Sequence, residues 1–592
     1  MLRPFKLRFR RQLKRQRRQV EDLSQQAEQG IERHLFKRFE RLLPVRRFVA
    51  AWIGLFILLI SCLAWQLVAL GDYYQTLRPV PGGIYSEGIL GTFTTANPMY
   101  ATNAVDSTVS HLVFSGLLKY DDQNKLVGDL ASDLSVDASG KIYTVHLRPH
   151  LTWQDGQPLT SADVLYTYQA IQNPDAKSPL SGGWQGISVA APDARTVVFS
   201  LPNTLASFPS SLTNGIVPMH LLAKVPMADL RTTDFNTVHP IGAGRFAWQA
   251  IQISGGNAAN AQEQIALIPF KAYAKGPPEL KEFIVRAFTN PQQLINTFKS
   301  GQLTAAAGLD SMPPELAKTK GVITHNFLLT AGTYVFFKTS SGVLADAKVR
   351  QALTLAANPQ QIIKKLDYMT RPVRGPLLEG QLGYDASSAQ ATNNVAAAKS
   401  TLDQDGWVVG NGGSRSKSGQ PLQFNLSAAD TPENRLVTAE LQNQWQAIGV
   451  KLVVQLQSPD VFSTTLTAHG YDAVLYGISI GPDPDVFAYW DSSQASVLSL
   501  NRLNLSEYQS ATADAALEGG RTRLDPTLRA VKYKPFLQAW QQDNPALGLY
   551  QPRYLYLTHG TVYGLSDHSL NTSADRFSNI ENWELRTAKV TD

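Results

Sequence analysis

Residues 48–70 form a predominantly apolar run that contains no charged side chain. A helix of this length is about 34 Å long, enough to cross a hydrocarbon core of about 30 Å. Arg46 and Arg47 precede the run, and Asp72 follows it. Because basic flanks stay on the cytoplasmic side of a membrane, the pattern predicts a transmembrane anchor. Residues 1–47 are then cytoplasmic, and the rest of the chain lies outside the bacterial cell membrane.

The apolar run also contains the single cysteine, Cys62. The sequence Leu59-Ile60-Ser61-Cys62 resembles a bacterial lipobox, in which the cysteine is lipidated after cleavage. The apolar run continues eight residues past Cys62, however, and the segment before it is long for a signal peptide. An uncleaved anchor and a lipoprotein both remain open, and either one tethers the body to the outer face. A single cysteine excludes an intrachain disulfide and a cysteine-based zinc cluster.

The segment before the anchor has apolar residues at steps of three and four. They are Val20, Leu23, Ala27, Ile31, Leu35, Phe39 and Leu42. This spacing predicts an amphipathic helix within the basic segment 1–47. Three roles remain open for it: lying on the anionic inner leaflet, pairing with another helix, or serving only as a solvated topogenic tail.

After a predicted linker at 71–81, strand-like and helix-like patterns alternate without a fixed internal repeat. Residues 141–147 alternate apolar and polar positions, which predicts a half-buried strand. Thr160 with Asp163 three residues later predicts a capped helix start. Residues 436–448 have helical spacing and are followed by a strand pattern. The predicted fold class is α/β.

Charge is distributed unevenly along the chain. Residues 1–47 hold 15 Lys and Arg against 5 Asp and Glu, whereas the remaining residues hold 39 against 43. The net charge of +6 therefore belongs to the tail, and this argues against a nucleic-acid surface on the body. Only His146 and His150 lie four residues apart, and Pro149 between them prevents a shared helix face. We therefore expect no metal site and no cofactor.

One short motif is typical of serine hydrolases. Gly477 to Gly481 match the pattern G-x-S-x-G, and His559, Asp567 and His568 are later residues of the types that complete a triad. The nucleophile in such enzymes is followed directly by a helix. Pro484 disfavours a helix there, so we expect the protein to bind a ligand and not to be an enzyme.

Several segments, taken in order, resemble bacterial extracellular solute-binding proteins of family 5, the peptide- and nickel-binding subunits of ABC importers. The strongest likeness combines Trp153, the turn Asp155-Gly156 and the helix start at Thr160. The full set of similar segments is 82–121, 130–171, 241–246, 294–303, Phe337 with 345–362, 471–472 and 482–485. Two segments depart from the family pattern, since Arg245 replaces the usual proline and the acidic pair expected around Gln302 is absent.

The resemblance implies a type II periplasmic-binding-protein-like fold with two hinged lobes and an extra subdomain in lobe I. By analogy, lobe I spans 82–287, lobe II spans 288–552, and 553–592 return to lobe I. The lobes of such proteins close over a ligand.

The resemblance also points to candidate ligand-binding residues, which are Tyr476, Ser479, Ile480, Asp483 and Trp490. In peptide-binding members an aspartate pairs with the free amino group of the peptide, and Ile480 stands at that position here. A buried ammonium without a carboxylate costs several kcal/mol. We therefore expect a ligand with a blocked or neutral end, an internal peptide stretch or a different solute, unless Asp483 restores the contact. For the aromatic residues, packing in the core is the alternative.

The predicted function is capture of a peptide-class ligand and its delivery to ABC transporter permease subunits by a protein tethered to the lipid bilayer. The long basic tail leaves an alternative open, in which the protein senses a ligand outside, or organises an envelope complex, and signals through residues 1–47.

Overall fold

The computed structural model describes three stretches of the chain: 45–254, 262–499 and 502–591. The chain divides into two compact units. One unit comprises Met1–Arg78 with Thr587–Asp592, and the other comprises Pro79–Arg586.

In the first unit, helix α3 (Arg46–Tyr74) contains the predicted anchor. Its segment Arg46–Leu67 has a mean hydropathy of 2.4 and is long and apolar enough to span a membrane. None of its most apolar window is buried, which distinguishes it from a core helix. The predicted amphipathic helix of the tail lies outside the described residues.

The predicted linker at 71–81 is instead largely ordered secondary structure. Helix α3 continues to Tyr74, and strand β1 (Gln75–Val80) pairs with β23 (Arg586–Thr591) at the other end of the sequence. The prolines and glycines suggested a linker locally, but pairing with a strand some 500 residues away is a long-range event that local composition does not encode.

The second unit is built around two principal sheets. The first has seven strands, in the spatial order β13 (Val322–Leu328), β22 (Arg553–His559), β12 (Ala305–Ala307), β2 (Ile84–Leu90), β11 (Glu282–Phe288), β10 (Gln262–Pro269) and β9 (Phe246–Ser254). The second has five strands, in the order β19 (Lys451–Gln457), β18 (Gln423–Ala429), β20 (Ala473–Ser479), β14 (Ala331–Phe337) and β21 (Ala546–Tyr550). Both sheets mix parallel and antiparallel pairs, which confirms the α/β class.

Smaller sheets accompany these two. A four-stranded antiparallel sheet forms the extra subdomain, in the order β5 (Ala131–Val136), β6 (Ile142–Leu147), β8 (Thr196–Ser200) and β7 (Ser188–Asp193). The others are β3 (Leu118–Tyr120) with β4 (Leu126–Gly128), and β15 (Val408–Val409) with β16 (Arg415–Lys417) and β17 (Gln420–Pro421).

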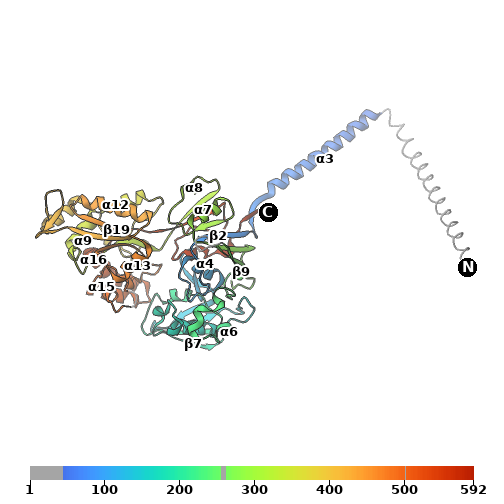
Figure 1. Ribbon diagram of the computed structural model, residues 1–592. Coiled ribbons are helices and arrows are strands. Elements are labelled where there is room, and N and C mark those ends of the chain that lie inside the picture. The colour runs from blue at the N-terminus through green and yellow to red at the C-terminus, as the bar shows by residue number, and fades with distance from the viewer. Residues whose placement is uncertain (1–44, 255–261, 500–501, 592) are drawn as a thin grey trace, which may run out of the picture. The chain divides into compact units, whose positions relative to one another are not determined.

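Helices cover the sheets. In chain order they are α4 (Ala104–Val113), α5 (Ser161–Gln172), α6 (Met219–Leu222), α7 (Pro291–Lys299), α8 (Pro314–Ala317), α9 (Ala347–Ala356), α10 (Pro359–Lys365), α11 (Val395–Gln404), α12 (Pro432–Gln446), α13 (Pro459–Ala468), α14 (Phe487–Trp490), α15 (Ala511–Arg521) and α16 (Pro526–Asp543). In Figure 1, α9, α12 and α16 gather with β19, whereas α4 lies with β2 and β9.

Each principal sheet has its own hydrophobic core, and this defines two lobes. The cores around the seven-stranded sheet draw on residues 85–327 and 555–583. The cores around the five-stranded sheet draw on residues 334–550. No residue of one set of cores belongs to the other. We therefore name residues 82–329 with 553–586 lobe I, and residues 330–552 lobe II.

The first crossover between the lobes lies later than the expected position near residue 287. Strands β12 and β13, at 305–328, still belong to the seven-stranded sheet, and the chain enters the second sheet only at β14. The segment beyond 287 stays in lobe I because β12 pairs with β2 and β13 pairs with β22. The chain returns to the first sheet between Tyr550 and Arg553.

Local signals in the sequence correspond closely to these elements. Helix α5 begins after Thr160, whose side chain and Asp163 form the predicted capping box. The Asp-Gly turn is present, because Trp153 N donates to Gln157 O at 2.8 Å and Gly156 has φ +85°. Trp153 itself is fully buried.

Candidate functional site

The two crossovers lie side by side and are joined by hydrogen bonds. Leu329 N donates to Pro552 O at 2.9 Å, and Gln551 Nε2 donates to Leu329 O at 3.3 Å. Thr330 Oγ1 donates to Asn571 Oδ1 at 2.7 Å. Hydrogen bonds thus hold the two crossovers together as a hinge between the lobes, and each lobe has a cavity that reaches it.

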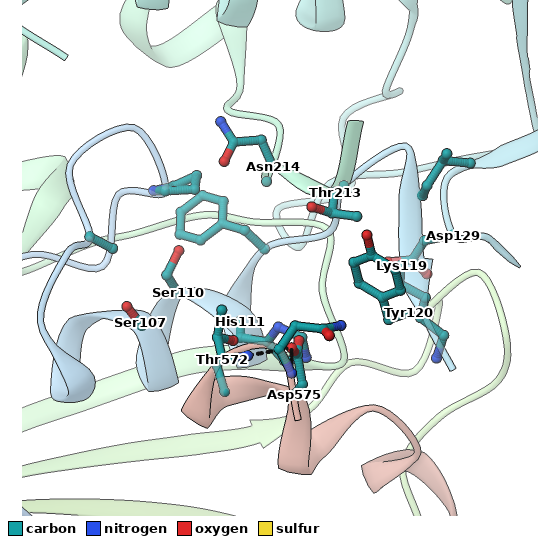
Figure 2. A pocket seen from close by; sticks show the side chains of 18 of the residues that line it. Ser107, Ser110, His111, Lys119, Tyr120, Asp129, Thr213, Asn214, Thr572 and Asp575 are labelled. Atoms are coloured by element: carbon teal, nitrogen blue, oxygen red, sulfur yellow. Dashed lines mark hydrogen bonds between the residues drawn. The ribbon is translucent and has the colours of Figure 1, made fainter. Parts of the chain in front are cut away.

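The lobe I cavity has a volume of about 220 Å³ and reaches the hinge through Asn571. Its polar lining comprises Ser107, Ser110, His111, Tyr120, Thr213, Asn214, Asn571 and Thr572, together with the charged residues Lys119, Asp129, Arg245 and Asp575. Figure 2 shows Ser107, Ser110 and His111 along α4, with Thr572 and Asp575 beside His111. These groups form a wall suited to hydrogen bonding with a polar ligand.

Several polar groups of this wall lack a hydrogen-bonding partner. His111 Nε2 and Asn214 Nδ2 are buried and form no hydrogen bond within the described part of the chain. Burial, and then the nearby Arg245 charge, hold the pKa of His111 well below its ordinary value, so this imidazole is neutral near pH 7. Buried polar atoms are usually satisfied, so these two are available to a ligand.

Three charged residues of this lining, Lys119, Asp129 and Arg245, form a buried cluster of balanced charges with Glu581. Glu581 accepts from Lys119 Nζ at 2.8 Å and from Arg245 Nε at 3.1 Å. Asp129 accepts from the Tyr273 hydroxyl at 2.8 Å. Burial, with Arg245 adding to it, lowers the pKa of Lys119 to about 8. With two cations and two carboxylates the cluster is neutral, so it adds no net charge to the cavity.

The lobe II cavity has a volume of about 440 Å³ and reaches the hinge through Pro552. It lies where β18 and β20 part. β18 pairs with β20 only at Ala473 and Val474. The edge of β20 that faces away from β14 therefore pairs with no strand of the described chain over residues 475–479. The helices α12 and α13 begin beside this gap. In open α/β sheets, ligands bind in such a crevice outside the carboxyl ends of parallel strands.

Three of the predicted residues lie on β20 or directly after it. Tyr476 is 39% exposed and lines the lobe II cavity. The Ser479 side chain is exposed, and its carbonyl accepts from the Tyr489 hydroxyl at 2.7 Å. Ile480 is 7% exposed and packs into a lobe II core, while its N–H donates to Thr330 O at the hinge.

The two aspartates that follow are both engaged by arginines. Asp483 accepts from Arg529 at 2.8 and 2.9 Å through both carboxylate oxygens. Asp485 forms an ion pair with Arg521 at 3.3 Å and accepts from Ser207 Oγ of lobe I at 2.8 Å. Both carboxylates are therefore already neutralised within the protein.

Trp490 lies away from both cavities. It is fully buried, and its ring stacks on Phe336 with centroids 5.5 Å apart and meets Trp540 edge-on at 5.4 Å. This is the core packing that the sequence left open as the alternative for the aromatic residues. Trp490 thus supports the loop after β20 from beneath.

The G-x-S-x-G motif lacks the geometry of a nucleophile elbow. Residues 480–486 after Ser479 are not helical, and the next helix, α14, begins only at Phe487. His559 and His568 belong to lobe I, and no hydrogen bond within the described residues joins either one to Ser479. The arrangement therefore offers no base to activate this serine.

The family model for bacterial extracellular solute-binding proteins, family 5, matches residues 125–498, more than half of the chain. The chain belongs to this family. Curated proteins that it resembles include protein XP55 of Streptomyces lividans, which is 29% identical over 471 residues, covering 77% of this chain and 80% of that protein. The oligopeptide-binding protein AppA of Bacillus subtilis is 24% identical over 86% of this chain and 92% of its own.

Solved structures of the family share the two-lobed fold. AppA of Bacillus subtilis in complex with a nonapeptide superimposes with a TM-score of 0.68, covering 86% of this chain and all of that one at 24% identity. NikZ of Campylobacter jejuni in complex with Ni(L-His) has a TM-score of 0.71, with 85% and 99% covered at 23% identity. The expected family and fold are therefore confirmed.

Several residues around the cavities had no signal in the sequence of this family 5 protein. Glu433, Thr333 and Phe462 line the lobe II cavity from three different elements, and His111 lines the lobe I cavity. The Thr-Pro start of α12 marks a helix but does not reveal that Glu433 faces a cavity. Within the described residues, no group of three His, Cys, Asp or Glu side chains is arranged to hold a metal ion.

Proposed function

We propose that this protein captures a peptide-class ligand between its lobes and delivers it, chemically unchanged, to the permease subunits of an ABC importer. Membership of family 5 supports capture and delivery, and it favours delivery over the sensing alternative. In the G-x-S-x-G motif, no hydrogen bond within the described residues joins Ser479 to a histidine that could act as its base. This supports binding of the ligand without catalysis.

The unpaired side of β20 is the observation that carries the peptide assignment. Backbone groups of residues 475–478 on that side pair with no strand of the described chain and can pair with an extended peptide, and the cavity beside them can receive a side chain. A Cβ built at Gly477 meets only Thr333 Oγ1, at 4.0 Å, so a second backbone can approach closely there. Tyr476 and Ser479 are the proposed ligand contacts on this strand.

The strand end at Ile480 disfavours a free peptide amino terminus. The apolar Ile480 side chain supplies no countercharge, and both Asp483 oxygens are held by Arg529. An ammonium placed there would have to break a bidentate ion pair or stay unpaired. We therefore propose that the ligand presents a blocked end or an internal stretch at this position.

We also propose that α3 anchors the protein in the cell membrane, with residues 1–47 in the cytoplasm and the lobes outside. The length and hydropathy of Arg46–Leu67 support this, as do the preceding arginines. Cys62 lies within α3, and lipidation there remains the other route to a membrane tether.

Two measurements on the full-length protein in detergent test the proposal. Mass spectrometry of molecules that co-purify from cells grown in peptide-rich medium should reveal peptides. Isothermal titration with tetra-alanine amide should show binding of the N-acetylated form at least as tight as that of the free amine. A clear preference for the free amine would refute the role given to Ile480. Absence of peptides in the first experiment, together with no binding of either probe, would refute peptide capture.

Association with the importer separates delivery from sensing. A protein that lacks residues 1–47 should still co-purify with the permease subunits. If the truncation instead abolishes this association and releases cytoplasmic partners, the sensing alternative is correct.

A further inference from the structure

The lobe II cavity contains a carboxylate without a countercharge. Glu433 stands in the first turn of α12 and lines the cavity. Its Oε1 accepts from the Tyr550 hydroxyl at 2.8 Å, and Tyr550 is fully buried. Within the described part of the chain, no cation lies within ion-pair distance of Glu433.

Arg553 is the cation whose charge acts on the Glu433 carboxyl, and it is already engaged. Arg553 donates to both Asp367 oxygens at 2.6 and 2.8 Å and to Asn326 at 2.5 Å. Its guanidinium also lies 4.2 Å from the centre of the Tyr368 ring. Arg553 and Asp367 neutralise each other, so the surroundings of Glu433 retain one uncompensated negative charge. Burial accordingly raises the pKa of the Glu433 carboxyl.

The walls of the cavity suit a long side chain with a cationic tip. Phe462 and Tyr476 have ring centroids 6.0 Å apart, and Leu466 and Leu475 add apolar surface. Alkyl stems of Lys and Arg pack on such surfaces while their charged ends seek a carboxylate, and aromatic faces attract cations.

We propose that Glu433 receives a basic side chain of a bound peptide, with the ammonium or guanidinium group paired to its carboxylate and the stem packed against the Phe462 and Tyr476 rings. This selects peptides with Lys or Arg at one position, and it rests on the proposed function of peptide capture. The subsite is separate from the strand end at Ile480, since four residues of β-strand span about 13 Å. The cation it takes is therefore a side chain and not the peptide amino terminus.

Matched peptides test this inference on the full-length protein in detergent. The probes are N-acetylated tetra-alanine amide, its variants with Lys at each position in turn, the same variants with Nε-acetyllysine, and free-amine tetra-alanine amide. Isothermal titration should show one Lys position binding roughly tenfold to a hundredfold more tightly than its Nε-acetyllysine counterpart. The free-amine peptide without lysine should gain nothing over the acetylated one.

The variant Glu433→Gln keeps the size of the side chain and an acceptor for Tyr550. It should abolish the preference for Lys over Nε-acetyllysine, and binding of the Nε-acetyllysine peptides shows that the variant folds. Asp460→Asn, at an exposed position on the adjacent helix α13, removes the same charge outside the cavity and should keep the preference.

Equal binding of the Lys and Nε-acetyllysine peptides by the wild type would overturn the inference, as would a Lys preference that survives in Glu433→Gln. In both cases binding of the neutral peptides would leave peptide capture intact. If the free amine alone confers the gain, the cavity takes an amino terminus and the side-chain assignment is wrong. Failure of every peptide to bind would reject peptide capture, and the inference with it.

Discussion

Both carboxylate oxygens of Asp483 accept hydrogen bonds from the guanidinium of Arg529, at 2.8 and 2.9 Å. Arg529 is only 7% exposed in its side chain, whereas Asp483 is 27% exposed. The carboxylate in the loop after β20 therefore satisfies a buried cation of α16, and this places its role in lobe II stability.

Asp483→Asn should accordingly weaken lobe II and not amine recognition. Removing one partner of a buried ion pair leaves the other uncompensated, so we expect a loss of about 3 kcal/mol in the free energy of unfolding, measured by denaturant titration. The ratio of affinities for free and N-acetylated tetra-alanine amide should stay within about twofold. A large drop confined to the free-amine peptide would show that Asp483 binds the ligand directly. Asp460→Asn serves as the surface control.

The buried Lys119 should make the stability of lobe I depend on pH. Its pKa is lowered from 10.5 to about 8, chiefly by burial, so in this window the unfolded chain binds more protons than the folded one. The free energy of unfolding of the wild type should therefore rise between about pH 8 and pH 10.5, relative to Lys119→Gln. Parallel stability curves for the two proteins across this range would contradict the lowered pKa.

The glycine turn at Gly242 should tolerate no side chain. A Cβ built there lies 1.9 Å from Val113 O, and Gly242 N also donates to Gln154 Oε1 at 2.9 Å. Because backbone must move to relieve this overlap, Gly242→Ala should cost at least about 2 kcal/mol of unfolding free energy. Gly183→Ala, where nothing lies within 4 Å, should change the stability by less than about 0.5 kcal/mol.

The proposed orientation predicts the behaviour of topology reporters. Green fluorescent protein fused before residue 1 should fluoresce, because it folds in the cytoplasm, and alkaline phosphatase fused after residue 592 should be active outside. The full-length protein should sediment with membranes, and a chain beginning at residue 75 should be released from them. An inactive phosphatase at the C-terminus would show that the lobes do not lie outside and would contradict the proposed orientation. If α3 is an uncleaved anchor, the variant Cys62→Ser should still sediment with membranes.

Local chemistry made parts of this molecule predictable from sequence. The apolar run of α3, the capping box at Thr160 and the Asp-Gly turn each depend on residues within a few positions of one another. The two-lobed fold could be predicted from the ordered family motifs, because their combination is far more specific than any single one.

Other features depend on partners that are distant in the sequence. Arg245, a departure from the family pattern, is completed by Glu581, 336 residues later, in the charge cluster beneath the lobe I cavity. Trp490 resembled a ligand-lining residue, but it fills a core formed by α14, α16 and β14. The position of the first crossover likewise depends on β12 and β13 pairing with strands of lobe I.

The sequence by itself determined the long apolar helix, the α/β class and the family, because hydrophobic length, periodicity and motif order are properties of neighbouring residues. Only the tertiary structure decided which carboxylates are neutralised and which remains unpaired. Asp483 and Glu433 look alike as acidic residues in the sequence, yet packing supplies Arg529 to the first, and none of the described residues forms an ion pair with the second. Charge compensation depends on distances across the folded chain, and folding alone sets those distances.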